Sequence, residues 1–109
     1  MGIDYYIGED QVRLTSAFWY NEFLNWVASM GDYPQILDHS PIHGNYELTN
    51  EKASMYSGSI SKLLAEVNTL LAGNCPEFAR DILTEMKRGC ELALANKKRI
   101  TMDDGAWGT

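Results

Sequence analysis

The amino-acid sequence predicts a mainly α-helical single domain of three helices, built on an antiparallel helical hairpin. Three observations lead to this fold class. Two stretches in the second half repeat apolar residues with the period of a helix, a stop and a start signal separate them, and 109 residues leave room for one core. A small two-stranded β element, pairing residues 3–7 with residues 99–102, is predicted beside the helices.

The N-terminal half begins with a predicted strand and helix. Residues 3–7 are β-branched and aromatic apart from Asp4 and lie between two glycines, which predicts a short strand. Thr15 or Ser16 can cap a helix that ends at about Met30. One buried face of this helix is expected, because its apolar positions follow a helical period. These positions are Trp19, Tyr20, Phe23, Leu24, Trp26, Val27 and Met30.

Residues 32–48 show little periodicity and contain two prolines and a glycine. We expect an irregular connection here, with one helical turn near residues 35–38. A connection of this length is unusual in a compact domain, and long ordered loops often carry function.

The predicted hairpin consists of helices over about residues 50–72 and 75–96. Gly73 suits the left-handed position after a helix, Asn74 can cap the next helix, and Pro76 fits its first turn. Both helices carry apolar stripes with steps of four and three residues, which favours packing against each other. The stripes are Tyr56, Ile60, Leu63, Val67 and Leu70 in the first and Ala79, Leu83, Met86, Cys90 and Ala93 in the second.

Composition restricts the location and the partners of the chain. The sequence has no apolar run long enough to span a membrane and no secretory signal at its start, so we expect a cytoplasmic protein without membrane contact. The net charge is −6, and residues 1–50 hold seven acidic residues against Arg13 alone. Residues 51–109 are balanced, so the whole excess lies in the first half. The negative electrostatic field of this half repels nucleic acid and attracts basic protein surfaces, so we expect a basic protein partner and no direct binding of nucleic acid.

The candidate reactive residues do not form a recognisable catalytic or metal site. His39 and His43 have a spacing that can hold zinc on a helix, but Pro41 lies between them. Ser40 and Cys75 lack a neighbouring motif that supplies a base and an oxyanion hole. Cys75 and Cys90 would lie about 22 Å apart on one helix, too far for a disulfide. No enzyme activity, metal or cofactor is therefore predicted.

A stripe of small residues follows the opposite side of the first hairpin helix. Small side chains let another backbone approach closely, so either the aromatic first helix packs there or the stripe docks a partner or a second copy of the chain. A homodimer thus remains open. The stripe consists of Ser54, Gly58, Ser61, Ala65 and Ala72.

Aromatic residues concentrate in the same half as the acidic excess. Nine of the twelve lie in residues 1–50, and one helical stripe cannot bury all those of the first helix. Tyrosine and tryptophan are favoured interface anchors, so we predict a partner-binding surface here, against the alternative of ordinary core aromatics with a solubilising charge. Its predicted residues are Trp19, Tyr20, Glu22, Trp26, Asp32, Tyr33, Asp38, Tyr46 and Glu47.

The favoured hypothesis is a small acidic, non-enzymatic interaction protein that binds and inhibits or neutralises a basic protein partner. Toxin-immunity proteins and phage-encoded anti-defence inhibitors have this type of composition, although no motif connects the chain to either class. The alternatives are a small-molecule-binding module, with a pocket between the first helix and residues 32–48, and an enzyme centred on His39 and His43.

Overall fold

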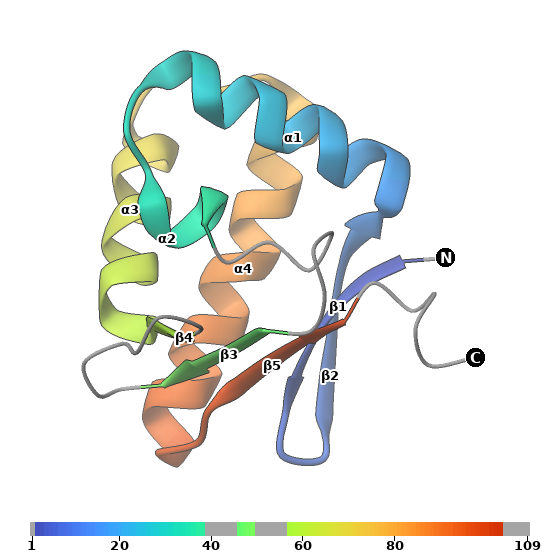
Figure 1. Ribbon diagram of the computed structural model, residues 1–109, viewed down its shortest axis with the longest axis vertical. Coiled ribbons are helices and arrows are strands. Elements are labelled where there is room, and N and C mark those ends of the chain that lie inside the picture. Colours follow the sequence, from blue (N-terminus) through green and yellow to red (C-terminus); the bar gives the residue numbers. More distant parts are fainter. Residues whose placement is uncertain (1, 39–45, 50–56, 104–109) are drawn as a thin grey trace.

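The computed structural model describes residues 2–38, 46–49 and 57–103. These ranges form a five-stranded sheet with helices packed against one face (Figure 1). The helices contain more residues than the strands, so the prediction of a mainly helical chain is confirmed. The elements are β1 (Gly2–Ile7), β2 (Asp10–Ser16), α1 (Ala17–Met30), α2 (Pro34–Leu37), β3 (Tyr46–Thr49), β4 (Ser57–Ser59), α3 (Ile60–Ala72), α4 (Glu77–Asn96) and β5 (Ile100–Asp103).

The sheet has the strand order β2-β1-β5-β3-β4. Strands β2, β1 and β5 form an antiparallel three-stranded part; β3 is antiparallel to β5, and β4 is parallel to β3. The backbone of Asp4–Tyr6 pairs with that of Thr101–Asp103, which brings the two ends of the chain together as predicted. The prediction of only two strands is wrong, because β1 and β5 each have a second neighbour.

Strand β2 is the largest element that the sequence prediction omitted. A two-residue turn, Gly8 and Glu9, joins it to β1, and Gly8 has the positive φ of 62° that tight hairpin turns require. In β2 the buried residues Val12 and Leu14 alternate with exposed Gln11 and Arg13. This alternation is typical of a strand with one face against a core.

Helix α1 starts where the sequence predicts. The Trp19 N–H donates to the Ser16 side-chain oxygen at 3.3 Å, which caps the first turn, and the helix ends at Met30. In Figure 1, α1 crosses the upper part of α4, whereas α3 and α4 lie side by side and run in opposite directions. None of the helices in the described ranges is long and apolar enough to cross a membrane.

The predicted helix over residues 50–72 is wrong in its first part. Strand β4 occupies Ser57–Ser59, and α3 begins only at Ile60, where the Lys62 N–H donates to the Ser59 hydroxyl. The small-residue stripe is therefore not a helical feature, because Gly58 lies in a strand. The prediction of three helices is also incomplete, because the turn expected near residues 35–38 is the short helix α2. Of the remaining stripe, Ser54 lies outside the described residues, and Ser61, Ala65 and Ala72 are exposed.

The core lies between the sheet and helices α1, α3 and α4. Tyr5 of β1 is fully buried beneath α4, where Gly89 stands in the middle of the helix. A Cβ atom at Gly89 would lie 2.8 Å from the Tyr5 ring, closer than carbon atoms approach each other. Glycine costs up to about 1 kcal/mol in a helix relative to alanine. Here it allows the backbone of α4 to contact the tyrosine ring.

Helix α2 is held by a side chain from α3. The two carboxylate oxygens of Glu66 accept the backbone N–H groups of Gln35 and Ile36, each at 3.0 Å. The Gln35 side-chain oxygen in turn accepts the Ser59 N–H at 2.9 Å. Because N–H groups in a first helical turn have no partner within the helix, Glu66 acts as the cap that α2 lacks in its own sequence.

Replacing Glu66 with alanine is expected to lower the free energy of unfolding by about 2 kcal/mol, since two backbone donors lose a charged acceptor. Urea denaturation followed by circular dichroism measures this change. The matched control is Glu85→Ala, which removes only an exposed ion pair with Arg88 and should cost less than about 0.5 kcal/mol. Equal losses in the two variants would contradict the capping role.

Glu66 should also make stability depend on pH. Burial raises the pKa of Glu66 above the usual glutamate value of 4.5, and the charges of Asp32 and Asp38 raise it further, while the hydrogen bonds from Gln35 and Ile36 lower it. The folded protein therefore holds this proton to a higher pH than the unfolded chain does. The stability that the raised pKa of Glu66 contributes is complete below pH 4.5, where the carboxyl group is protonated in both states. It is lost as the pH rises through the pKa of the folded state. Wild type should thus lose stability relative to Glu66→Gln over this interval, as urea midpoints at successive pH values would show. A constant difference between the two proteins would contradict the prediction.

Candidate functional site

An exposed aromatic cluster lies where the start of α1, the end of β2 and the first turns of α4 meet. The Trp19 ring packs against Phe78 with ring centroids 5.5 Å apart, and Phe18 packs edge-on against Trp19 at the same distance. Phe18 is 67 % exposed and Trp19 is 46 % exposed. We call the hollow beside these rings the aromatic groove. It has a volume of about 210 Å³ and is lined by Leu14, Thr15, Trp19, Phe78, Asp81 and Ile82.

The fold holds this cluster at the edge of the sheet. Strand β2 is the outermost strand on its side, and its last residue, Ser16, caps α1. The cap places Phe18 and Trp19 in the first turn of the helix, directly after the strand. Phe78 occupies the second position of α4, so all three rings stand in the first turns of their helices.

The charges beside the aromatic groove are acidic. Glu22 lies one turn along α1 from Phe18 and Trp19, and Asp81 lines the groove itself. Glu77 precedes Phe78 in the first turn of α4 and is exposed. A surface of this kind suits a partner that offers apolar side chains among lysines or arginines.

The nearby cations lie elsewhere. Arg80 follows Phe78 by two residues and so lies about 200° around α4, away from the groove. Arg13 of β2 forms an ion pair with Asp4, which is buried although it belongs to the opposite face of the sheet from Tyr5. Arg88 pairs with Glu85 two turns farther along α4. These contacts leave the negative charge at the groove uncompensated by the neighbouring arginines.

The predicted binding residues on α1 divide between surface and core. Trp19, Glu22 and Trp26 follow one side of the helix at spacings of three and four residues. Trp19 and Glu22 are exposed, whereas Trp26 is half-buried with its ring centroid 6.2 Å from that of Phe23. The prediction of Tyr20 as a binding residue is corrected by the structure. Tyr20 is 1 % exposed and packs in the core against Phe23, so it is not available to a partner.

The other predicted binding residues lie apart from the aromatic groove. Asp32 and Asp38 are exposed at the two ends of the α2 segment, and Tyr33 between them is half-buried. These two carboxylates lie near enough to Glu66 to influence its pKa, which places them beside α3. Tyr46 and Glu47 belong to β3, on the far side of β5 from β1. The nine predicted residues therefore do not form one surface.

The structure gives no support to a metal or thiol site in the part of the chain that it describes. No group of three or more potential metal-binding side chains occurs there, and His39, Ser40 and His43 lie outside the described residues. Cys75 and Cys90 are both free thiols. Burial raises the pKa of Cys90 to about 12, with a smaller contribution from Glu91, so this thiol stays protonated at neutral pH.

Sequence reasoning missed Phe18 and Phe78 as members of the site. Phe78 lies outside the apolar stripe of its helix, which runs through Ala79, Leu83 and Met86, and this position off the stripe is a signal that could have found it. Phe18 likewise lies on the opposite side of α1 from the buried residues Tyr20 and Val27. The contact between the start of α1 and the start of α4 is what brings both rings into one binding surface. No protein family model, curated protein or solved structure matches this chain.

Proposed function

We propose that this protein is a non-enzymatic interaction module that binds a basic protein partner at the aromatic groove and thereby blocks that partner's basic surface. The observation that carries this proposal is the aromatic stack of exposed Phe18 and Trp19 on partly buried Phe78, beside Glu22 and Asp81. Large exposed aromatic side chains cost solubility, and they are the residues that most often anchor interfaces.

The charge distribution supports a basic partner in particular. The net charge of −6 comes from the half of the chain that contains α1, and Glu22, Glu77 and Asp81 stand around the aromatic stack. Opposite charge accelerates the encounter of two proteins, while the desolvated aromatic centre supplies most of the affinity. A cationic surface with one or two apolar side chains is the complement of this arrangement. Covering such a surface would prevent it from contacting its own anionic substrate or target.

Site-specific photo-crosslinking tests the proposal. A photo-reactive amino acid replaces Phe18 in one version of the protein and, as a matched control, exposed Ser61 of α3 in another. We expect a basic protein to be crosslinked from position 18 and not from position 61.

The partner identified by crosslinking is then purified in its unmodified form and titrated with the wild-type chain. Its dissociation constant should rise at least about tenfold between 50 and 500 mM salt, because exposed charges are screened at a Debye length of a few ångströms. Identical crosslinks from both positions, or affinity independent of salt, would overturn the proposal. Crosslinking to a second copy of this chain would instead identify the groove as a homodimer interface and would likewise overturn the proposal of a basic partner.

A further inference from the structure

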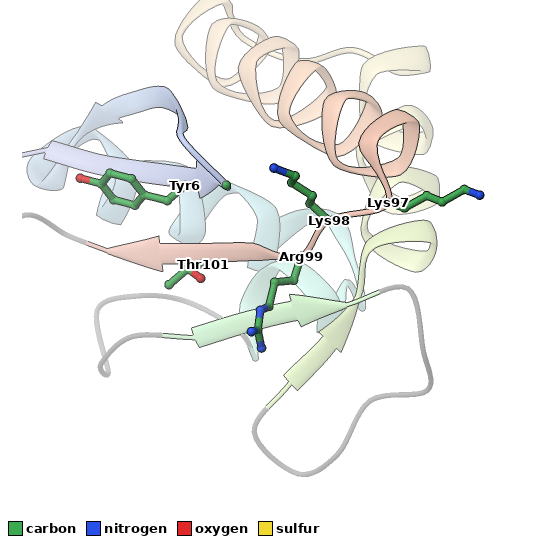
Figure 2. A pocket seen from close by; sticks show the side chains of 6 residues that line it. Tyr6, Lys97, Lys98, Arg99 and Thr101 are labelled. Carbon is green, nitrogen blue, oxygen red and sulfur yellow. The ribbon is translucent and has the colours of Figure 1, made fainter.

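A second hollow, with the opposite charge, lies at the other end of the sheet. The end of α4, the β1–β2 turn and the start of β5 enclose a volume of about 400 Å³ (Figure 2). This volume is within the range of small-molecule sites. We call it the basic hollow; it is lined by Tyr6, Gly8, Lys97, Lys98, Arg99 and Thr101.

The C-terminus of α4 brings the cations to this place. The Lys97 and Lys98 N–H groups donate to the carbonyl oxygens of Leu94 and Ala93, at 3.3 and 2.9 Å, which closes the helix. This closure needs a left-handed residue, and Lys97 adopts it with a φ of 54°, a conformation in which glycine is usual. The chain then continues directly into β5, so Lys98 and Arg99 lie between the end of α4 and the start of β5.

The side chain of Lys98 lies over the β1–β2 turn. A Cβ atom at Gly8 would lie 2.6 Å from the Lys98 Nζ atom and 3.0 Å from its Cδ atom, so the lysine side chain runs directly across the glycine. Figure 2 shows Lys98 extending toward the end of β1, Lys97 extending to the other side and Arg99 extending toward β3. Of the cations that line the hollow, Lys98 is the one whose side chain lies against Gly8.

The ammonium groups of this hollow lack carboxylate partners among the residues that the structure describes. Neither Lys97 nor Lys98 forms an ion pair there, in contrast to Arg13 and Arg88. Next to these cations, Tyr6 and Thr101 are directly opposite each other in the β1–β5 ladder. The hollow therefore combines the positive charge of Lys98 with two hydroxyl-bearing side chains, Tyr6 and Thr101, of which Tyr6 also offers a half-buried aromatic ring.

We propose that the basic hollow binds a small phosphomonoester, with Lys98 contacting the phosphate and the Tyr6 ring contacting the organic part. A compact ammonium group is a common phosphate ligand, and hydroxyl groups and a ring can orient the remainder. The charge of the whole chain, −6, opposes a long polyanion such as nucleic acid. Glu9 and Asp10, which follow Gly8 in the turn, further favour a single phosphate over a polyphosphate chain.

Amide NMR titrations of the full chain test this site with three probes: inorganic phosphate, adenosine monophosphate and adenosine. We expect saturable shifts of the Gly8, Lys98 and Thr101 amides with adenosine monophosphate, weaker saturable shifts with inorganic phosphate and none with adenosine. Because the aromatic groove is remote from these residues, the result is independent of the protein partner. Equal binding of adenosine and its monophosphate, or no saturable shift with either phosphate probe at 10 mM, would overturn the proposal.

Two variants distinguish a built site from general attraction. Lys98→Met keeps the side-chain stem over Gly8 but removes the charge, and it should weaken binding of adenosine monophosphate at least about tenfold. Lys62→Ala removes one exposed lysine from α3 and should leave the affinity unchanged. Equal weakening by the two variants would show that only net charge matters and would overturn the assignment. Tighter binding of a single-stranded oligonucleotide than of the monophosphate would also overturn it.

Discussion

A protein in which serine replaces both Phe18 and Trp19 is expected to bind the proposed basic partner at least about 100-fold more weakly than wild type, which corresponds to about 2.7 kcal/mol. These two rings form the exposed part of the aromatic stack, and interface energy concentrates in such anchors. Calorimetric titration with the purified partner measures the loss. The prediction depends on the proposed function.

The matched control for this variant is Met30→Ser. Met30 is 45 % exposed, nearly the same as Trp19, but it lies at the opposite end of α1 from the aromatic groove. It should change the affinity less than about twofold, because a contact outside the anchor cluster contributes little. Urea denaturation of both variants shows whether they remain folded. If Met30→Ser weakens binding as much as the double variant, the interface lies along α1 rather than at the groove.

Replacing Gly89 with leucine is expected to lower the free energy of unfolding by about 3 kcal/mol, a large share of the total stability of a small domain. Even a single Cβ atom at this position would lie 2.8 Å from Cδ2 of Tyr5, which is fully buried and cannot move into solvent. The helix must therefore separate from β1 or the ring must leave its place. Urea denaturation measures the change.

Gly73→Leu is the control for that change. Gly73 is exposed after α3, with a φ of −96°, and the nearest atom to a Cβ there is the Leu70 carbonyl oxygen at an ordinary 3.7 Å. Its effect should stay within about 0.5 kcal/mol. The double variant Tyr5→Ala with Gly89→Leu should be more stable than the sum of the two single changes predicts, because the small residue makes room for the large one. Simple additivity would contradict a direct contact between Gly89 and Tyr5.

The mainly helical character of this fold could be predicted because the signals for helices are local. Helix α1 follows from the Ser16 cap and the apolar spacing, and α4 from the proline in its entry and the period of Ala79, Leu83 and Met86. A helix satisfies its own backbone within four residues, so a short stretch of sequence contains most of its determinants. The start of α3 was placed too early, because the apolar spacing extends from Ile60 back to Tyr56, across the residues that form β4.

The strands were predicted less completely because their partners are distant in sequence. The alternation in β2 and the glycine of its turn were visible in the sequence, but β3 and β4 are three or four residues long and give no periodic signal. Strand β3 depends on hydrogen bonds with β5, more than fifty residues away. Such a pairing becomes favourable only when the helices have brought both segments to the same side of the core.

By itself, the sequence determined that the chain is mainly helical, that its first half is acidic and aromatic, and that this half offers candidates for a binding surface. Tertiary structure alone decided which aromatic residues reach that surface. Tyr20 and Trp19 are neighbours of the same chemical class, yet one is 1 % exposed and the other 46 % exposed. The reason is geometric: successive helical residues point about 100° apart, and the elements packed around α1 cover one direction and leave the next open.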